Sequence, residues 1–276
     1  MMLARRSRPV YVLGHSPGEL ARLSAQARVY DEQTERLLLA AGVRRGMRLI
    51  DFGSGAGDVA LVAARIVGPA GEVIGVDRAP EAVAAARARI RSLGIRNVRF
   101  VEQDLNALIL DRRADAVIGR LVLMYQADQV AAIRRAAAQV RPGGIIAFHE
   151  IDLGIGMESA PPRGLWDRHV ELVRETFRRG GIDVRSGFHL RRRFIEAGLA
   201  HPQALATAGL EGGADSPAWD LLAATVRSLL PMMERLGIAT AAEIGPDTLA
   251  DRLRQAGVDA GSTVMAPLLA GVWARR

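Results

Sequence analysis

The sequence predicts an α/β fold built on a doubly wound, largely parallel sheet. Short apolar runs alternate with helix-like segments from residue 47 to residue 150, which is the pattern of βαβ units. The first run, residues 47–52, stops at a glycine-rich turn that leads directly into a helix-like segment at 59–67. Hydrophobic residues make up 49% of the 276 residues, which is enough for a sizeable core. We therefore expect one large domain with appended helices.

Two helices are expected before the first strand. Ser16 to Glu19 has the Ser-x-x-Glu form of a capping box, with proline at the first helical position. A helix over 17–28 should follow, and a second one over 31–41 should end at Gly42. Residues 1–42 would then form an N-terminal cap.

The turn after the first strand has the pattern D-x-G-x-G-x-G-D from Asp51 to Asp58. Glycines such as Gly53 and Gly55 allow a positive φ and a close approach of the backbone to a ligand. The next helix points its positive end into the same space, so the turn predicts a nucleotide-like ligand. A dinucleotide fingerprint needs a third glycine at position 58, where Asp58 would repel a diphosphate. A P-loop is excluded because no Gly-Lys-Ser/Thr sequence follows.

Acidic residues end the next two apolar runs. Residues 72–77 end at Asp77, and an acid at the end of the second strand accepts hydrogen bonds from both hydroxyls of a ribose. Residues 98–105 end with Asp104 and the apolar Leu105. A helix at 79–93, ending at Gly94, separates the two runs.

Two more runs complete the alternation. Residues 114–120 end at Arg120, and residues 145–150 end at the pair His149-Glu150, after a helix at 127–140. Ligands of such sheets lie at the carboxyl ends of the strands. The candidate site residues that collect there are Asp51, Gly53, Asp77, Asp104, Arg120, His149 and Glu150.

Beyond residue 150 the alternation stops. We expect a loop over 152–162, with four glycines and prolines, and then an amphipathic helix at 165–178. The remaining elements should be a helix at 187–197, a short strand at 202–209, helices at 216–236 and 246–256, and a final strand at 263–273. The predicted organisation is an N-terminal cap (1–42), a core (43–151), a helical lid with a sixth strand (152–260) and the final strand (261–276).

The five runs, in this order, resemble the class I S-adenosyl-L-methionine (SAM) dependent methyltransferases. The D-x-G-x-G-x-G turn is similar to motif I of that family, and residues 114–120 resemble its motif IV strand. The resemblance implies a Rossmann-like sheet of seven strands whose last strand is antiparallel at the sheet edge. It also implies SAM as cofactor and S-adenosylhomocysteine as product. SAM is cationic and has no phosphate, so an acid-rich loop suits it.

The resemblance also assigns cofactor contacts. The acid at the position of Asp104 accepts from the adenine amino group, Leu105 packs on the ring, and the strand ending at Arg120 passes the methionine part. Tyr30, between the two cap helices, is expected either at the cofactor's carboxylate or in the core. The cofactor-binding residues expected on this basis are Tyr30, Asp51, Gly53, Gly55, Asp77, Arg78, Asp104, Leu105 and Arg120.

Methyl transfer from a sulfonium needs alignment and a dry pocket, and it needs a base only where the acceptor keeps its proton. His149 and Glu150 are the favoured candidates for that base, since His149 lies at the expected ligand edge and histidine titrates near neutrality. The alternatives are His15, Tyr125 and His189. A structural hydrogen bond is the alternative role for His149. Candidates for an acceptor pocket, each with plain core packing as the alternative, are His15, Met124, Tyr125 and Trp166.

Residues 30–150 look most like the ubiquinone/menaquinone-type and natural-product methyltransferases. Leu123-Met124-Tyr125 stands where those enzymes have a His-rich stretch. A helical lid suits a small, largely apolar acceptor, methylated at O, N or C, with secondary metabolism as one context. The alternatives are an RNA or protein methyltransferase and a SAM-binding protein without transferase activity.

The amino-acid composition excludes several kinds of site and makes some partners less favoured. The chain has no cysteine, which excludes thiolate zinc sites, iron–sulfur clusters and disulfides, and no metal site is expected. Net charge is +7, but the arginines are scattered and aromatic residues are only 4%, so nucleic acid is not a favoured partner. No apolar stretch reaches the roughly 20 residues of a membrane span. No secretory signal is evident. We expect a cytoplasmic monomer or homodimer.

Overall fold

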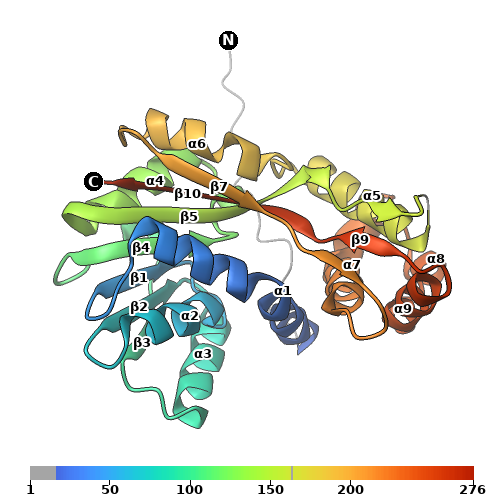
Figure 1. Cartoon of the computed structure of the whole chain (residues 1–276), viewed down its shortest axis with the longest axis horizontal. Coiled ribbons are helices and arrows are strands. Elements are labelled where there is room, and N and C mark those ends of the chain that lie inside the picture. The colour runs from blue at the N-terminus through green and yellow to red at the C-terminus, as the bar shows by residue number, and fades with distance from the viewer. Residues whose placement is uncertain (1–16, 163) are drawn as a thin grey trace.

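The computed structural model describes residues 17–162 and 164–276, and a seven-stranded sheet lies at its centre (Figure 1). Its strands are β1 (Arg48–Phe52), β2 (Glu72–Asp77), β3 (Val98–Glu102), β4 (Ala114–Arg120), β5 (Val140–Gly156), β7 (Gln203–Thr207) and β10 (Pro267–Arg275). They are ordered β3-β2-β1-β4-β5-β10-β7. Strands β1 to β5 are parallel, and β10 runs antiparallel to both β5 and β7. The predicted doubly wound α/β sheet with an antiparallel last strand is confirmed.

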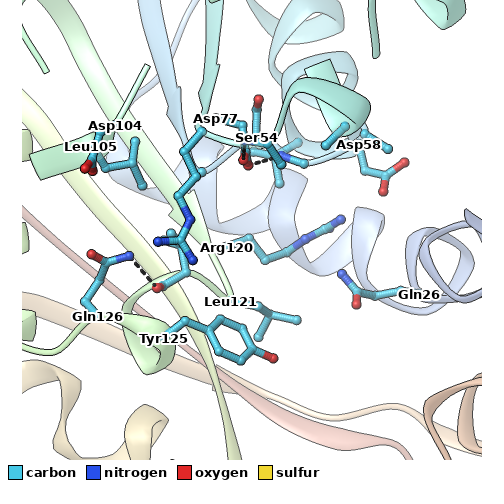
Figure 2. A pocket seen from close by; sticks show the side chains of 18 of the residues that line it. Gln26, Ser54, Asp58, Asp77, Asp104, Leu105, Arg120, Leu121, Tyr125 and Gln126 are labelled. Carbon is cyan, nitrogen blue, oxygen red and sulfur yellow. Dashed lines mark hydrogen bonds between the residues drawn. The ribbon is translucent and has the colours of Figure 1, made fainter. Parts of the chain in front are cut away.

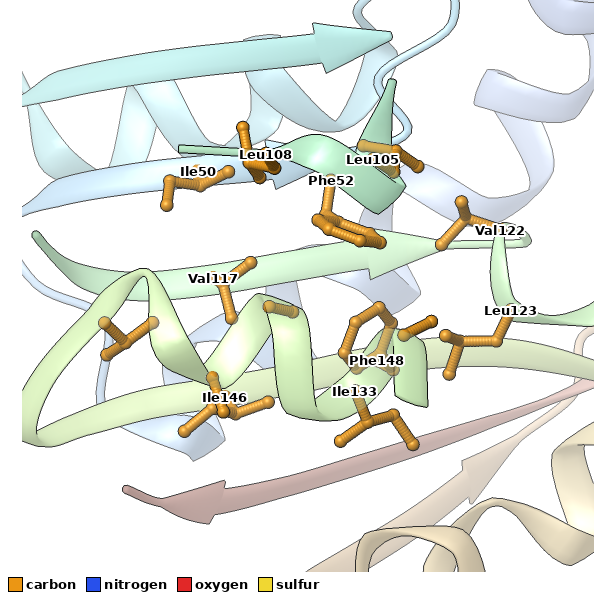
Figure 3. Close-up of a cluster of buried hydrophobic side chains, with 14 of the residues drawn as sticks. Ile50, Phe52, Leu105, Leu108, Val117, Val122, Leu123, Ile133, Ile146 and Phe148 are labelled. Atoms are coloured by element: carbon orange, nitrogen blue, oxygen red, sulfur yellow. The ribbon is translucent and has the colours of Figure 1, made fainter. Parts of the chain in front are cut away.

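Helices cover both faces of this sheet (Figure 1). Successive side chains of a strand point to opposite faces. On β1, Leu49 packs with the helices of one face, and Ile50 and Phe52 pack with those of the other. Figure 3 shows the second of these two clusters, where Phe52 and Phe148 meet edge to face with ring centroids 5.9 Å apart. The first face carries α1 (Pro17–Ala41), α2 (Asp58–Val67) and α3 (Pro80–Ser92), and the second carries α4 (Gln129–Ala138) and α6 (Ser186–Glu196).

A second group of elements lies beyond the carboxyl ends of the parallel strands (Figure 1). Its core is built around Trp166 and Trp219, whose rings meet edge to face at 5.6 Å. The group comprises α5 (Leu165–Arg179), α7 (Pro217–Arg235), α8 (Ala241–Ile244), α9 (Leu249–Asp259) and a three-stranded sheet of β6 (Ser159–Ala160), β9 (Thr263–Met265) and β8 (Leu210–Gly212), ordered β6-β9-β8. Two short 3₁₀ helices, η1 (Leu105–Ala107) and η2 (Leu123–Tyr125), follow β3 and β4.

The N-terminal region forms one helix where two were predicted. Helix α1 runs without interruption from Pro17 to Ala41. From residue 19 to residue 41 the sequence has neither glycine nor proline, so nothing breaks the backbone hydrogen bonds at Tyr30. Tyr30 therefore lies inside the helix. Ser16, the predicted cap, lies outside the described residues.

Two predictions for the C-terminal half were wrong. The predicted loop over 152–162 is mostly strand, because β5 continues to Gly156 and pairs there with Pro267 of β10. The predicted final strand over 263–273 divides between two sheets, with β9 ending at Met265 and β10 starting at Pro267. A register shift between Pro267 and Leu268 marks the division.

Strand β10 also does not lie at the edge of the sheet. It is enclosed between β5 and β7, and β7 is the edge strand. Pro267 is tolerated nevertheless, because pairing with β7 begins only at Leu269. Among the helices of the described residues, none combines the length and apolarity needed to cross a lipid bilayer.

Candidate functional site

A first cavity, of about 150 Å³, opens at the carboxyl ends of β1 to β4 (Figure 2). The glycine turn, the start of α3, η1 and the segment after β4 line it, together with Gln26 of α1. Figure 2 shows the labelled side chains arranged around this space. The structure brings seven of the predicted cofactor residues together here, namely Gly53, Gly55, Asp77, Arg78, Asp104, Leu105 and Arg120.

The glycine turn is shaped by positive φ angles. Gly55 has φ 49°, and a β-carbon built on it would meet no atom within 4 Å, so a side chain there would project into open space. A β-carbon on Gly53 would lie 2.3 Å from the Val122 side chain. One glycine thus keeps space open for a ligand, and the other lets the segment after β4 press on the turn.

Asp77 holds this turn in place. One carboxylate oxygen accepts from the amide of Gly55 at 2.9 Å, and the other accepts from the amide of Ala79 at 3.0 Å. Each carboxylate oxygen has two lone pairs, so Asp77 keeps acceptor capacity toward the cavity that it lines.

Asp104 and Leu105 form the opposite wall. The Asp104 carboxylate caps η1 by accepting from the amide of Asn106 at 2.9 Å. Leu105 is buried in the core cluster of β1 and β4 and also reaches the cavity. This wall therefore offers an acidic group next to a flat apolar contact.

Asp51 lies fully buried behind the turn and is not among the residues that line the cavity. In the described part of the chain, neither of its oxygens makes a well-formed hydrogen bond, and the hydroxyl of Ser54 also has none. Burial raises the pKa of the Asp51 carboxyl to about 7, against the lowering effect of Arg120. The buried Ser54 hydroxyl, which has no partner in the described part of the chain and belongs to a residue that lines the cavity, indicates a place where a ligand completes the hydrogen bonding.

Arg120 connects the cavity to α1. Its side chain is almost fully buried, and one guanidinium nitrogen donates both to the Asp31 carboxylate and to the Thr34 hydroxyl, each at 3.0 Å. The residue also lines the cavity, so it places positive charge among the acids. Across the cavity Asp58 pairs with Arg89 at 2.5 Å, which offsets part of the negative charge at the start of α2.

A second, smaller cavity of about 60 Å³ adjoins the first, between the sheet and the helices α5 and α7. Every one of its described lining residues is uncharged, and aromatic rings of Tyr30, Tyr125, Trp166 and Phe177 contribute to the wall. Of the predicted pocket residues, Met124, Tyr125 and Trp166 are here; His15 lies outside the described residues. Tyr30 lines this cavity and not the first.

The two cavities share the residues Gln26, Leu121 and Tyr125. A polar, acid-rich space is thus separated from an apolar one by a single layer of side chains. Sequence reasoning missed Gln26 and Leu121. Nothing in the sequence distinguishes Gln26 from the other polar residues of its helix. Leu121 resembles the last residue of a strand in the sequence, although its φ in the structure is 53°.

The two predicted bases have no access to either cavity. His149 is fully buried, and its Nδ1 lies 3.4 Å from the Thr34 hydroxyl, while burial lowers its pKa to about 3. Glu150 is fully buried on the opposite face of β5 and accepts from backbone amides after β4. Neither lines a cavity, so this placement gives no support to a catalytic role.

Comparisons with known proteins agree on one family. Residues 44–180 match the family model described as a methyltransferase domain. An arsenite methyltransferase of Aquipseudomonas alcaligenes is 32% identical over 122 residues, 41% of this chain and 35% of that protein. A ubiquinone/menaquinone biosynthesis C-methyltransferase of Pasteurella multocida is 35% identical over 106 residues, 38% of this chain and 40% of that protein.

Residues 44–180 form a methyltransferase domain of the SAM-dependent kind. A solved methyltransferase has the same fold: phosphoethanolamine N-methyltransferase 2 of Haemonchus contortus, in complex with phosphomonomethylethanolamine and S-adenosylhomocysteine. It matches 89% of this chain and 52% of that one, at 15% identity and a TM-score of 0.55. The chain spans less than half the length of the two curated relatives.

The first cavity fits the chemistry of SAM, the cofactor of the family that residues 44–180 match. Asp77 and Asp104 offer acceptors for hydroxyl and amino groups, and Asp51 and Ser54 offer unsatisfied oxygens near the turn. The basic Arg120 suits a carboxylate. Within the described part of the chain, no group of three or more acidic or histidine residues could hold a metal ion.

Proposed function

We propose that this chain transfers a methyl group from SAM, bound in the first cavity, to a small and largely apolar acceptor held in the second. The observation that carries the proposal is the contact between the two cavities at Gln26, Leu121 and Tyr125. A polar space for a charged nucleoside and an apolar space for an acceptor meet there. Residues 152–260 would then act as the lid and substrate region.

The proposed contacts to the cofactor follow from the chemistry of the lining. Asp77 would accept from the two ribose hydroxyls, and Asp104 with Leu105 would hold the adenine. Arg120 would face the carboxylate, and Asp51, buried behind the turn, would act on the ammonium only through its charge. SAM, when bound, supplies a methyl group already activated by the sulfonium charge.

The proposed role of the second cavity is to align the acceptor and exclude water. Its aromatic and aliphatic lining stabilises an apolar molecule by removing its surface from water, at about 25 cal/mol per Å². The described lining contains no carboxylate or histidine. Support for the assignment of Met124, Tyr125 and Trp166 to the acceptor comes from their place in this wall.

Calorimetry followed by an acceptor screen tests the proposal. We expect titration with SAM and with S-adenosylhomocysteine to show binding, and titration with NAD to show none. Quinones, phenols and indoles are then supplied with SAM, and S-adenosylhomocysteine release is measured. Failure to bind SAM would overturn the cofactor site. Binding without release for every acceptor would overturn the transferase activity.

A variant of the second cavity separates the two sites. Leu222→Phe enlarges a buried wall residue of that cavity. The acceptor KM should then rise by about tenfold, which corresponds to about 1.4 kcal/mol of lost binding, while the dissociation constant for SAM stays the same. Leu222→Met, which conserves volume, is the matched control. An unchanged KM in Leu222→Phe would place the acceptor elsewhere.

A further inference from the structure

We propose that Glu150 is a positioning residue for methyl transfer: it fixes the loop of residues 121–125, which forms the boundary between the first and second cavities. The inference rests on the proposed function, because the boundary matters only if donor and acceptor meet across it. Glu150 lines neither cavity. Its effect on the reaction would therefore pass entirely through the backbone of the 121–125 loop.

The Glu150 carboxylate accepts three successive backbone amides. One oxygen accepts from Val122 at 2.9 Å and Leu123 at 2.8 Å, and the other accepts from Met124 at 3.2 Å. These amides lie at the start of the 3₁₀ helix η2, where backbone donors have no partner within the helix. A fully buried carboxylate thus satisfies all three, and each such charge-assisted bond is stronger than a neutral one.

The hydrogen bonds to Glu150 explain an unfavourable backbone conformation at Leu121. Leu121 has φ 53°, a left-handed conformation that a leucine rarely adopts and that costs of order 1–3 kcal/mol. Its own amide donates to the carbonyl oxygen of His149 at 2.9 Å. Strand β5 therefore binds four consecutive amides, from residue 121 to residue 124, and the left-handed turn persists because these bonds over-determine it.

The 121–125 loop lines both the first cavity, proposed for SAM, and the second cavity, proposed for the acceptor. Leu121 and Tyr125 line both cavities, Val122 lines only the first and Met124 only the second. The Val122 side chain also presses on Gly53 of the glycine turn, with 2.3 Å between Val122 and a β-carbon built on that glycine. A shift of the loop would therefore move the wall of the donor site and the wall of the acceptor site together.

Glu150 is itself held in place from α6. The Ser186 hydroxyl lies 3.5 Å from one carboxylate oxygen. Burial raises the pKa of the Glu150 carboxyl to about 7, and the three backbone amides and the positive charge of Arg193 act against this rise by favouring the ionised form. Arg193 in turn donates to the Ser186 backbone carbonyl at 3.1 Å. The loop is thus connected through Glu150 to a helix on the face of the sheet opposite to α1.

Hydrogen exchange and kinetics of Glu150→Gln test the inference. The amide of glutamine can still accept from Val122 and Leu123, but its NH₂ group cannot accept from Met124. We expect amides of the 121–125 loop to exchange at least about tenfold faster in mass spectrometry, with strands β1 and β4 unchanged. We expect kcat to fall by about 10²-fold, as for a small misalignment of reacting groups. The dissociation constant for SAM should rise by less than about tenfold, because Asp77 and Asp104, on the other walls of the donor site, are unchanged.

Glu171→Gln is the matched control, because it makes the same chemical change on a side chain that is 64% exposed. If Glu150→Gln does not fold, Glu150→Asp keeps the charge but is one methylene shorter, and the same faster exchange is expected. Unchanged exchange of the loop overturns the inference. A loss of kcat matched by faster exchange throughout the protein also overturns it, since that would be general destabilisation. Absence of SAM binding in the unmodified protein would instead refute the proposed function, and the exchange result would still decide the role of Glu150.

Discussion

Asp51, His149 and Glu150 are fully buried, and burial raises the pKa of the two carboxyls to about 7 and lowers that of the histidine to about 3. Sequence reasoning placed Asp51 and Asp77 at strand ends correctly, because an apolar run that stops at a carboxylate can be recognised in the sequence, but β5 continues past Glu150 to Gly156. Sequence reasoning could not assign the role of Glu150. That role depends on the register in which Arg120 of β4 lies beside His149 of β5, which brings the 121–125 loop over the neighbouring glutamate.

At the residue scale, Asp77→Ala should weaken SAM binding. The substitution removes the proposed pair of charge-assisted bonds to the ribose and the bond to the Gly55 amide, and we expect a loss of about 1.5–3 kcal/mol. Calorimetric titration measures it. Glu81→Ala, at an exposed acid in the first turn of α3, is the control. Equal affinity of Asp77→Ala and the unmodified protein would mean that another carboxylate binds the ribose.

Asp51 should make stability depend on pH. Burial raises its folded pKa from the ordinary 3.8 to about 7. The stability that comes from its protonated form is therefore complete below pH 3.8 and is lost as the pH rises through 7. Relative to the unmodified protein, Asp51→Asn should gain about 3 kcal/mol in the free energy of unfolding between pH 4.5 and pH 8. Urea denaturation of the ligand-free protein at both pH values measures the gain, and an identical difference at the two would refute it.

At the scale of elements, most strands and helices could be predicted, because the spacing of apolar residues and the glycines and prolines that end an element are both local features of the sequence. The structure of α1 and β10 could not. The predicted junction between a helix ending at residue 28 and one starting at residue 31 does not occur, because the residues around it are compatible with one helix that packs on the sheet through Leu37 and Leu38. The division of the last strand depends on β9 pairing with β6 and β8, which are segments too short to have a periodicity.

The packing of α1 on β10 gives a prediction at this scale. A β-carbon on Gly271 would lie 2.7 Å from the Leu37 side chain, which is fully buried. Gly271→Ala should therefore destabilise the protein by about 1–3 kcal/mol through overpacking. Leu37→Ala should relieve part of this cost, so the two substitutions together should destabilise less than their sum. Chemical denaturation of both single variants and the double variant measures the coupling, and simple additivity would show that helix and strand do not contact each other there.

At the scale of the whole molecule, the predicted core and lid are joined by shared elements. Helix α1 packs on the sheet through Leu37 and on α7 through Val29 and Tyr30, and β5 continues past residue 151. A predicted boundary at that residue rested on a change of pattern from alternating runs to glycines and prolines. The pattern reports which residues are buried and cannot show that one strand serves two parts of the molecule.

Tryptophan fluorescence should reveal a single cooperative unit. Trp166 and Trp219 report on the helical region and Trp273 reports on the sheet. In a Trp273→Phe variant, fluorescence reports unfolding of the helical region; in a Trp166→Phe/Trp219→Phe variant, it reports unfolding of the sheet. The urea midpoints of the two variants should be equal, once each is corrected for the change in stability that circular dichroism measures. Two separate midpoints would show that the helical region unfolds independently.

The length of β5 has a consequence for how an acceptor enters. Strand β5 is paired with β10 without interruption from Ile145 to Asp152 and again at Gly156, and its residues Ile151 and Leu153 form part of the wall of the second cavity. A rigid-body opening of the helical region away from the sheet would have to break these strand hydrogen bonds at every turnover. Small molecules should therefore enter and leave the second cavity through motions of its side chains, while the backbone around it stays in place. The rate of entry should then depend on the size of the acceptor more than on the viscosity of the medium.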